Sequence, residues 1–248
     1  MIARKSSAEL ATMREAGRIT ALALAAVGEA ALPGVTTGEL DALAEEVIRS
    51  HGALPAFKGY HGFPATICAS PNETIVHGIP GRTRLAEGDI FSVDVGAIHD
   101  GYYGDSAFTF AVGTVDPKAQ APLDATKASL DAGIAACRAG NRLGDVGAAV
   151  QAVAEAAGFS VVREYVGHGI GRAMHEDPSV PNYGTAGRGI ELAVGMVLAI
   201  ESMVNAGGHA TCALDDGWTV LTADGSLSAH FEHTVAVTEH GPSILTLP

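Results

Sequence analysis

The sequence predicts an α/β protein in which two related halves each contain a pair of helices followed by antiparallel strands. Helical patterns with matching caps occur early in each half, and strand-like segments follow each helix pair. Three glycines also recur at one constant spacing: Gly34, Gly38 and Gly52 are matched by Gly140, Gly144 and Gly158. We therefore expect a single domain over residues 1–248, with halves at about 7–112 and 113–240.

The first helix pair is marked by two capping boxes. Ser6 precedes Glu9 by three residues, which predicts a helix that runs to about Ala31, before Pro33-Gly34. Thr36 and Glu39 form the second box. The helix after it carries one apolar stripe, formed by Leu40, Leu43, Ala44, Val47 and Ile48.

The second helix pair repeats this design. A helical stretch runs from about Pro117 to Ala139 and ends at Gly140, and a further helix starts near Asp145. A chance likeness between amphipathic helices is the alternative, but the matching glycines favour a duplication. The last helix carries its stripe on Val146, Ala149, Val150, Val153 and Ala154.

Strand-like alternation follows each helix pair. Residues Asp89–Ile98 and Gly104–Val112 are separated by the turn residues His99-Asp100-Gly101, which predicts a hairpin. In the second half, Val197–Val204 and His230–Thr238 are the clearest strands.

The composition limits the partners. The chain has 15 Lys and Arg against 28 Asp and Glu, a net charge of −13, which argues against binding to nucleic acid or to an anionic membrane. Cys68, Cys137 and Cys212 are widely separated, which excludes a disulfide framework and fits a reducing compartment. The start lacks a signal-peptide apolar run, and the apolar stretch Ala21–Gly28 is far below the roughly 20 residues that a bilayer requires. We expect a cytoplasmic protein.

Two aspartates interrupt the strands of the first half. Asp94 lies on the face opposite Phe91, Val93 and Val95 of the first strand, and Asp105 lies on the face opposite Phe108 and Phe110 of the second. The hairpin should therefore place both carboxylates on one non-core face. They should be directly opposite or offset by one pair, where like charges repel. Either this face is open to water, or a cation lies between the carboxylates.

The second half favours the cation. Glu201 and Glu232 interrupt apolar strands, and His168 lies between glycines that would let the backbone approach a ligand closely. Four carboxylates balance two divalent cations, and such an oxygen-rich set suits Mn²⁺, Fe²⁺ or Co²⁺. Two such ions lower the pKa of a water held between them toward ~7, which is hydrolytic chemistry.

Two more histidines have spacings that suggest a role. His77 ends a strand-like segment, and His175 lies seven residues after His168, so either is a candidate hydrogen-bond donor to substrate. A structural histidine is the alternative for each. The other seven we assign by default to structural or surface roles: His51, His61, His99, His209, His230, His233 and His240.

At these residues the sequence resembles the type I methionine aminopeptidases. The segment from Tyr165 through His175 to Tyr183 is similar to that family's signature, and the stretch around His77 is similar to its substrate-histidine segment. The likeness runs from about residue 8 to 240 and implies the pita-bread fold. The ordered set Asp94, Asp105, His168, Glu201 and Glu232 matches the family's five metal ligands.

The resemblance also implies roles. Asp94 would bind one metal ion, Glu201 and His168 the other, and Asp105 and Glu232 would bridge both. Glu201 would also act as general base toward the attacking water. By the same resemblance His175 would stabilise the developing oxyanion and His77 would contact the substrate near the scissile amide. The implied reaction removes the initiator methionine when the second residue is small.

The implied methionine pocket is apolar and aromatic. This sequence departs from the family at Phe57, where bacterial members often have Cys, at Phe63, where some have Tyr, and at Met174, where many have Phe. These residues keep the pocket apolar and leave the strictness of methionine preference open. The matching pocket positions are Tyr60, Phe63, Cys68, Met203 and Trp218.

The resemblance implies two divalent ions, either cobalt, manganese or iron(II), with zinc or nickel as alternatives. It implies nascent polypeptide N-termini as partners, at the ribosome exit, and a monomer. A proline-specific aminopeptidase or prolidase on the same fold is a rival. Such enzymes usually carry an extra N-terminal domain, for which a first helix at residue 6 leaves no room. A non-catalytic binding protein on this fold is a second rival, and we expect it to have lost ligands that this chain keeps.

Overall fold

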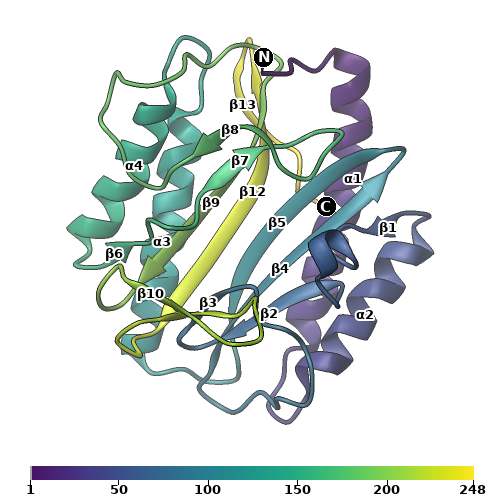
Figure 1. Cartoon of the computed structure of the whole chain (residues 1–248), viewed down its shortest axis with the longest axis vertical. Helices are drawn as coiled ribbons and strands as arrows, with labels where there is room; N and C mark the ends of the chain where they lie inside the picture. Colours follow the sequence, from purple (N-terminus) through teal and green to yellow (C-terminus); the bar gives the residue numbers. More distant parts are fainter. Residues whose placement is uncertain (1) are drawn as a thin grey trace.

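The computed structural model describes residues 2–248 and has the predicted mixture of helices and antiparallel sheets. Two sheets lie side by side, and each is accompanied by one helix pair. Figure 1 shows one pair at the right of the strands and the other pair at the left. The first pair is α1 (Ser7–Ala30) and α2 (Thr37–Ser50), and the second is α3 (Pro117–Ala136) and α4 (Leu143–Ala156).

The helix starts follow the predicted caps. Both capping boxes form, at Ser6 for α1 and at Thr36 for α2. Helix α4 begins at Leu143, slightly before the predicted start, because the Asp145 carboxylate accepts the backbone N–H of Arg142 at 2.7 Å. Helix α3 ends at Ala136 rather than Ala139, because the Asn141 side chain donates to the Ala136 carbonyl at 2.8 Å.

The first sheet is centred on β4 (Ile90–His99), which pairs along its whole length with β5 (Tyr102–Ala111). Strands β1 (Leu54–Pro55) and β2 (Ile67–Pro71) also pair with β4. Between β1 and β2 lies the short 3₁₀ helix η1 (Tyr60–Gly62). A small separate sheet contains β3 (Thr74–Val76), β10 (Thr211–Ala213) and β11 (Val220–Thr222).

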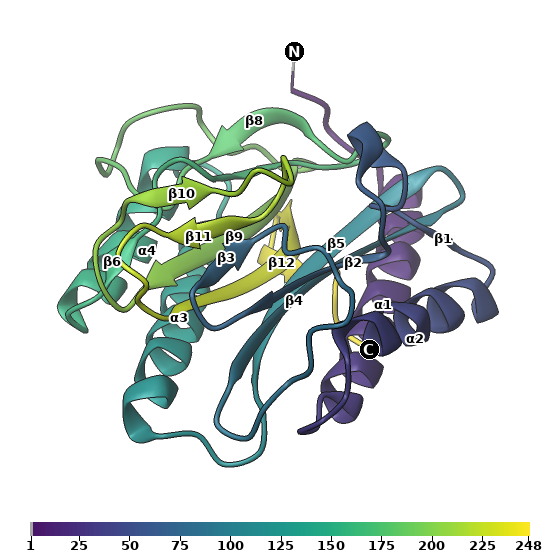
Figure 2. The ribbon, with the colours of Figure 1, turned by 60° about the horizontal axis from the view of Figure 1, so that its bottom comes forward.

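The second sheet has the order β13-β12-β9-β7-β8, and β6 also pairs with β9. In Figure 2 the small β3-β10-β11 sheet lies over the strands on the side away from the helices. The second sheet contains β6 (Ser160–Val161), β7 (Gly167–Gly169), β8 (Glu176–Val180), β9 (Val197–Asn205), β12 (Ser228–Thr238) and β13 (Gly241–Ile244).

Side-chain hydroxyls join the two sheets where β5 faces β12. The Thr234 hydroxyl donates to the Asp105 carbonyl at 2.8 Å and accepts the Asp105 N–H at 3.0 Å. The Thr109 hydroxyl makes the same pair of bonds to the backbone of His230. These buried bonds replace a backbone ladder. They also place the carboxylates of both halves next to one another.

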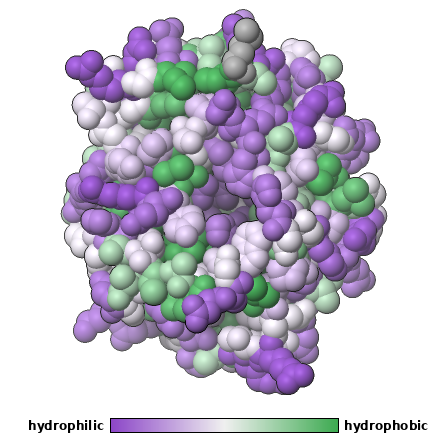
Figure 3. All heavy atoms as spheres, in the orientation of Figure 1, coloured by the Kyte–Doolittle hydropathy of each residue, from purple (hydrophilic) through white to green (hydrophobic). Residues whose placement is uncertain are grey.

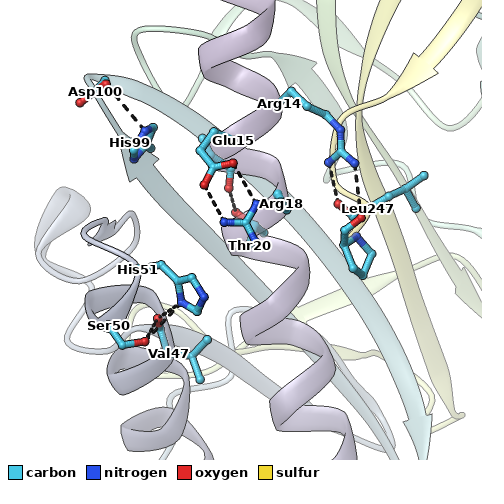
Figure 4. A network of polar contacts seen from close by, with 12 residues as sticks. Arg14, Glu15, Arg18, Thr20, Val47, Ser50, His51, His99, Asp100 and Leu247 are labelled. Atoms are coloured by element: carbon cyan, nitrogen blue, oxygen red, sulfur yellow. Dashed lines mark hydrogen bonds and ion pairs between the residues drawn. The ribbon is translucent and has the colours of Figure 1, made fainter.

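Each helix pair buries its apolar stripe against its own sheet. Phe91, Val93 and Val95 are fully buried against α1 and α2, as strand parity predicted. The C-terminal segment packs on α1, where the Arg14 guanidinium donates to the Leu247 carbonyl at 2.6 Å (Figure 4). Between residues 2 and 248, no helix is both long enough and apolar enough to span a membrane. The proposed duplication of the halves remains a prediction.

Candidate metal centre and adjoining cavity

The two aspartates come together as the hairpin predicted. In the β4–β5 ladder Asp105 is opposite Gly96 and Asp94 is opposite Ala107, so the carboxylates are offset by one pair. Their common face looks toward the second sheet rather than toward water. Asp105 is only 3% exposed. The alternative of a solvent-exposed face is therefore excluded.

The second sheet brings three more side chains to the same place. Glu201 on β9 and Glu232 on β12 are directly opposite one another in the ladder, and His168 on β7 is opposite Ala199 of β9. The His168 Nε2 lies 3.6 Å from an Asp105 carboxylate oxygen. Ligand atoms of Asp105, His168 and Glu232 all lie within 4.8 Å of one another. Five groups from five strands thus converge.

The electrostatics of this cluster fit a cation. Burial raises the pKa of Asp105 to about 7 and that of Glu201 to about 8, and burial together with the neighbouring carboxylates raises the pKa of Asp94 and Glu232 well above their ordinary values. Buried oxygens of Asp94, Asp105 and Glu232 have no hydrogen-bond partner. Hard oxygen donors that crowd together unpaired are a suitable set for divalent cations.

The glycines around His168 have a packing role, and their role in the approach of a ligand stays a prediction. A Cβ on Gly167 would collide with the Ala199 carbonyl, and a Cβ on Gly169 would collide with the Asp177 carbonyl. The short strand β7 lies between β8 and β9, and the two glycines allow both neighbours to approach closely. The same segment holds the His168 imidazole in place, because the ring Nδ1 lies 2.9 Å from the Gly169 carbonyl oxygen.

A cavity of about 330 Å³ opens beside the carboxylates. Part of its lining is apolar and aromatic, with the Phe63 and Trp218 rings edge to face at 5.1 Å. Figure 3 shows small apolar groups separated by polar residues across the face seen in Figure 1, with no dominant apolar patch there. The cavity is lined by Phe57, Tyr60, His61, Phe63, Cys68, Val76, His77, Asp94, Asp105, His168, Met174, His175, Glu201, Trp218 and Glu232.

Met203 is the one predicted pocket residue that does not line this cavity. It is fully buried and packs with Ile75, Val76 and Val220. Met203 shares a strand face with Glu201, but Val76, which belongs to the same cluster, forms the cavity wall. We correct the prediction accordingly. Two further lining residues, His61 in the short helix η1 and Val76 at the end of the three-residue strand β3, were not predicted, because elements this short show no periodicity.

The two candidate donor histidines lie at the cavity. The His175 Nδ1 is 2.8 Å from the Tyr60 hydroxyl, and its ring lies 4.2 Å from that of His168. Partial burial and the neighbouring histidines lower the pKa of His175 to about 4, and burial lowers that of His77. Both imidazoles are therefore neutral near pH 7 and carry one N–H each.

His230, which was assigned by default to a structural or surface role, lies beside the carboxylates. It lies two residues before Glu232 on the same face of β12, and its Nε2 is 3.6 Å from a Glu201 carboxylate oxygen. Strand parity with Glu232 was the available signal. His233, on the opposite face, lies with its Nδ1 2.8 Å from the Thr246 hydroxyl, which agrees with its exclusion as a ligand.

Comparison with known proteins gives one consistent family. Residues 11–239 match the sequence profile described as metallopeptidase family M24. The chain is 52% identical over 248 residues to a methionine aminopeptidase of Clostridium acetobutylicum, covering 100% of this chain and 99% of that protein. The crystal structure of a methionine aminopeptidase from Thermotoga maritima superposes with a TM-score of 0.99 at 45% identity, with complete coverage of both chains. A prolidase from Pyrococcus furiosus, at 22% identity and a TM-score of 0.81, covers 99% of this chain but 65% of its own and shares the fold.

Proposed function

The chain belongs to metallopeptidase family M24, and from this premise we propose that it is a methionine aminopeptidase that removes the N-terminal methionine from polypeptides with a small second residue. The observation that carries the proposal is one continuous site. An apolar, aromatic cavity adjoins two buried carboxylates, two partly buried carboxylates and a buried histidine. The similarity to methionine aminopeptidases over the full chain supports the same activity.

The proposal includes two divalent cations. Four carboxylates and one imidazole match such a pair in charge and in donor type. When bound, the cations would polarise the scissile carbonyl and make water a stronger nucleophile at neutral pH. Which element is used stays open among cobalt, manganese and iron(II), with zinc or nickel as alternatives. We assign the cations to Asp94, Asp105, His168, Glu201 and Glu232.

The remaining chemistry belongs to protein side chains. We assign Glu201 as the general base, because its carboxylate lines the cavity and is buried among groups that favour proton uptake. His175 would donate to the oxyanion that develops on the substrate carbonyl, and His77 would donate to the substrate near the scissile amide. Both assignments are supported by their place on the cavity wall and by the neutral state of their rings.

The cavity supplies the proposed methionine preference. Phe63, Trp218 and the Cys68 thiol form apolar walls against which a thioether gains dispersion and sulfur–aromatic contacts. Tyr60 lines the same cavity, and its hydroxyl lies 2.8 Å from the Nδ1 of His175. Met174, noted as a departure from the family, keeps its wall apolar.

The proposed substrate class is the N-termini of nascent chains, which would place the activity in the cytoplasm near the ribosome exit. We also propose that the protein acts as a monomer, as the family resemblance implies. The proposal involves neither nucleic acid nor membrane, as the net charge of −13 suggests.

A peptide panel tests the proposal. Enzyme stripped of metal with a chelator is resupplied with Mn²⁺, Co²⁺ or Fe²⁺ singly and assayed on Met-Ala-Ser, Met-Lys-Ser and Ala-Pro-Ser. We expect release of methionine from Met-Ala-Ser only after a cation returns, and much slower release from Met-Lys-Ser. Cleavage of Ala-Pro-Ser without cleavage of Met-Ala-Ser would instead identify a proline-specific aminopeptidase. Equal rates on both methionyl peptides would refute the small-residue rule.

A further inference from the structure

His230 is a buried imidazole that lies between two carboxylates and has no role in the reaction proposed for this site. It is 2% exposed, and its Nε2 lies 3.6 Å from a Glu201 oxygen and 3.8 Å from a Glu232 oxygen. This Nε2 has no hydrogen-bond partner among the described residues. A buried ring nitrogen without a partner is uncommon and calls for an explanation.

The backbone of His230 is held firmly at this place. Its N–H donates to the Thr109 hydroxyl at 2.8 Å, and its carbonyl accepts from the same hydroxyl at 2.9 Å. The Thr109 hydroxyl in turn lies 2.8 Å from that of Ser92. Across the β9–β12 ladder, His230 is opposite the fully buried Met203. The backbone position from which the imidazole extends is therefore fixed, and the ring has little space to turn away from the two carboxylates.

The placement favours a donor over a metal ligand. Across residues 2–248 one group of side chains has ligand atoms that all lie within 4.8 Å of each other, and it contains Asp105, His168 and Glu232 but not His230. A neutral imidazole carries one N–H, which carboxylate oxygens accept. Both separations are longer than a hydrogen bond, as is common for site contacts that shorten when the ligand binds.

We propose that His230 is a positioning residue whose Nε2–H orients the carboxylates of Glu201 and Glu232 for the cations. The inference rests on the proposed function only in taking these carboxylates as ligands. Partners of this kind fix the rotation of a ligand, and their removal costs about 10–100-fold in metal affinity. His230 would thereby set how tightly the site holds its cations and how the Glu201 carboxylate faces the substrate.

Metal titration of the full chain tests this directly. Mn²⁺ affinity is measured by calorimetry on metal-stripped protein for the parent, His230→Phe, His230→Gln and the matched control His233→Leu on the opposite face of β12. We expect His230→Phe to lose about 10–100-fold in affinity. His230→Gln, which regains an N–H donor, should recover most of that loss, and His233→Leu should keep the parent affinity.

Two outcomes would overturn the inference. Parent affinity in His230→Phe would mean that the nitrogen has no role toward the cations, and a loss in His230→Gln as large as in His230→Phe would indicate that the nitrogen is itself a ligand. If His230→Phe does not fold by circular dichroism, His230→Leu takes its place. Calorimetry needs no peptide, so a failure on Met-Ala-Ser would contradict the proposed function and leave this test intact. At saturating Mn²⁺, His230→Phe should lower kcat more than it changes KM.

Discussion

At the scale of the residue, Glu201 combines a place on the cavity wall with a carboxylate whose side chain is only 14% exposed. Glu201→Gln keeps the size of the side chain and removes both the charge and the proton acceptor. We expect kcat on Met-Ala-Ser at saturating Mn²⁺ to fall by about 10²–10⁴-fold, the usual contribution of a general base. Initial-rate kinetics measure the change. A variant that keeps more than a tenth of the parent kcat would contradict the assignment.

His175 offers a narrower test, because it is assigned only to the oxyanion. His175→Ala should lower kcat by roughly 10²–10³-fold, since a donor aimed at developing charge acts mainly in the transition state. The Mn²⁺ affinity should stay unchanged, because His175 is not one of the five assigned ligands. Tyr60→Phe is the companion variant, because it removes only the hydroxyl 2.8 Å from His175. A normal kcat in His175→Ala would reject the role.

Sequence reasoning located the acidic residues because a carboxylate inside an apolar strand is conspicuous and parity fixes its face. The structure brings Asp94, Asp105, Glu201 and Glu232 together, as their parity suggested. Parity could not show that Glu201 lines the cavity and Met203 does not, since both side chains lie on one face of β9. Met203 is instead buried against residues of β3. His230 shares the face of Glu232 but was not predicted as a site residue, because a lone histidine in a strand more often has a structural role.

At the scale of the element, side-chain hydroxyls connect β5 and β12 in place of backbone-to-backbone hydrogen bonds. Thr234→Val keeps the shape of the side chain but leaves the N–H and the carbonyl of Asp105 without their partner. Buried unsatisfied backbone costs about 1–3 kcal/mol of unfolding free energy. Urea unfolding of metal-free protein measures this loss. Thr211→Val on the short strand β10 is the control, and an equal effect of both variants would count against a special role for this contact.

The segment before α1 supports the loop that carries His175. Lys5 donates to the Glu176 carboxylate at 2.7 Å, and the other oxygen of Glu176 accepts the backbone N–H of Arg172 at 2.8 Å. The Lys5 side chain is only 6% exposed. The ion pair thus ties the start of the chain to the loop on which the proposed oxyanion donor lies.

Lys5→Met should therefore affect both stability and turnover. We expect a loss of about 1–3 kcal/mol in unfolding free energy, between the values for exposed and buried ion pairs, because Glu176 is left with an uncompensated charge. We also expect a lower kcat with unchanged Mn²⁺ affinity. Lys127→Met, which breaks the exposed pair with Asp131, should change neither by much. A reduction in Mn²⁺ affinity for Lys5→Met would point to a wider disturbance of the site.

The elements themselves were predicted to different degrees for physical reasons. Capping boxes and apolar stripes are local signals, so α1 and α2 were placed within a residue or two. The end of α3 was misplaced because it depends on a side chain from the following loop, Asn141. Strands β7 and β8 carry no alternation that periodicity detects, since glycines and close packing shape them.

At the scale of the whole molecule, both sheets bury their helix-facing sides and direct their acidic faces toward one another. Charge repulsion between these faces opposes folding unless protons or cations offset it. The sequence shows four carboxylates inside apolar strands. It does not show the hydroxyl contacts between β5 and β12 that bring these carboxylates together. Repulsion among these carboxylates therefore lowers the free energy of unfolding of the metal-free chain, at the site where the proposed cations would bind.

This cost has a measurable dependence on pH. Because the pKa of Asp105 is raised to about 7 and that of Glu201 to about 8, the metal-free folded chain binds more protons than the unfolded chain up to about pH 8. The free energy of unfolding should therefore fall as pH rises from 7 to 8.5, by about 1.4 kcal/mol per pH unit for each excess proton. The lowered pKa values of His175, His230 and His233 act in the opposite direction, but only below about pH 6.5.

Cations should remove or reverse this slope, since they favour the ionised carboxylates and bind more tightly as protons leave. Urea unfolding at pH 7 and 8.5, once with EDTA and once with saturating Mn²⁺, measures both slopes on the same protein. Glu232→Gln removes one of the groups whose pKa is raised, so its metal-free slope should be shallower than that of the parent. A metal-free stability that is flat or rises over this interval would show that the carboxylates are not held together in the folded chain.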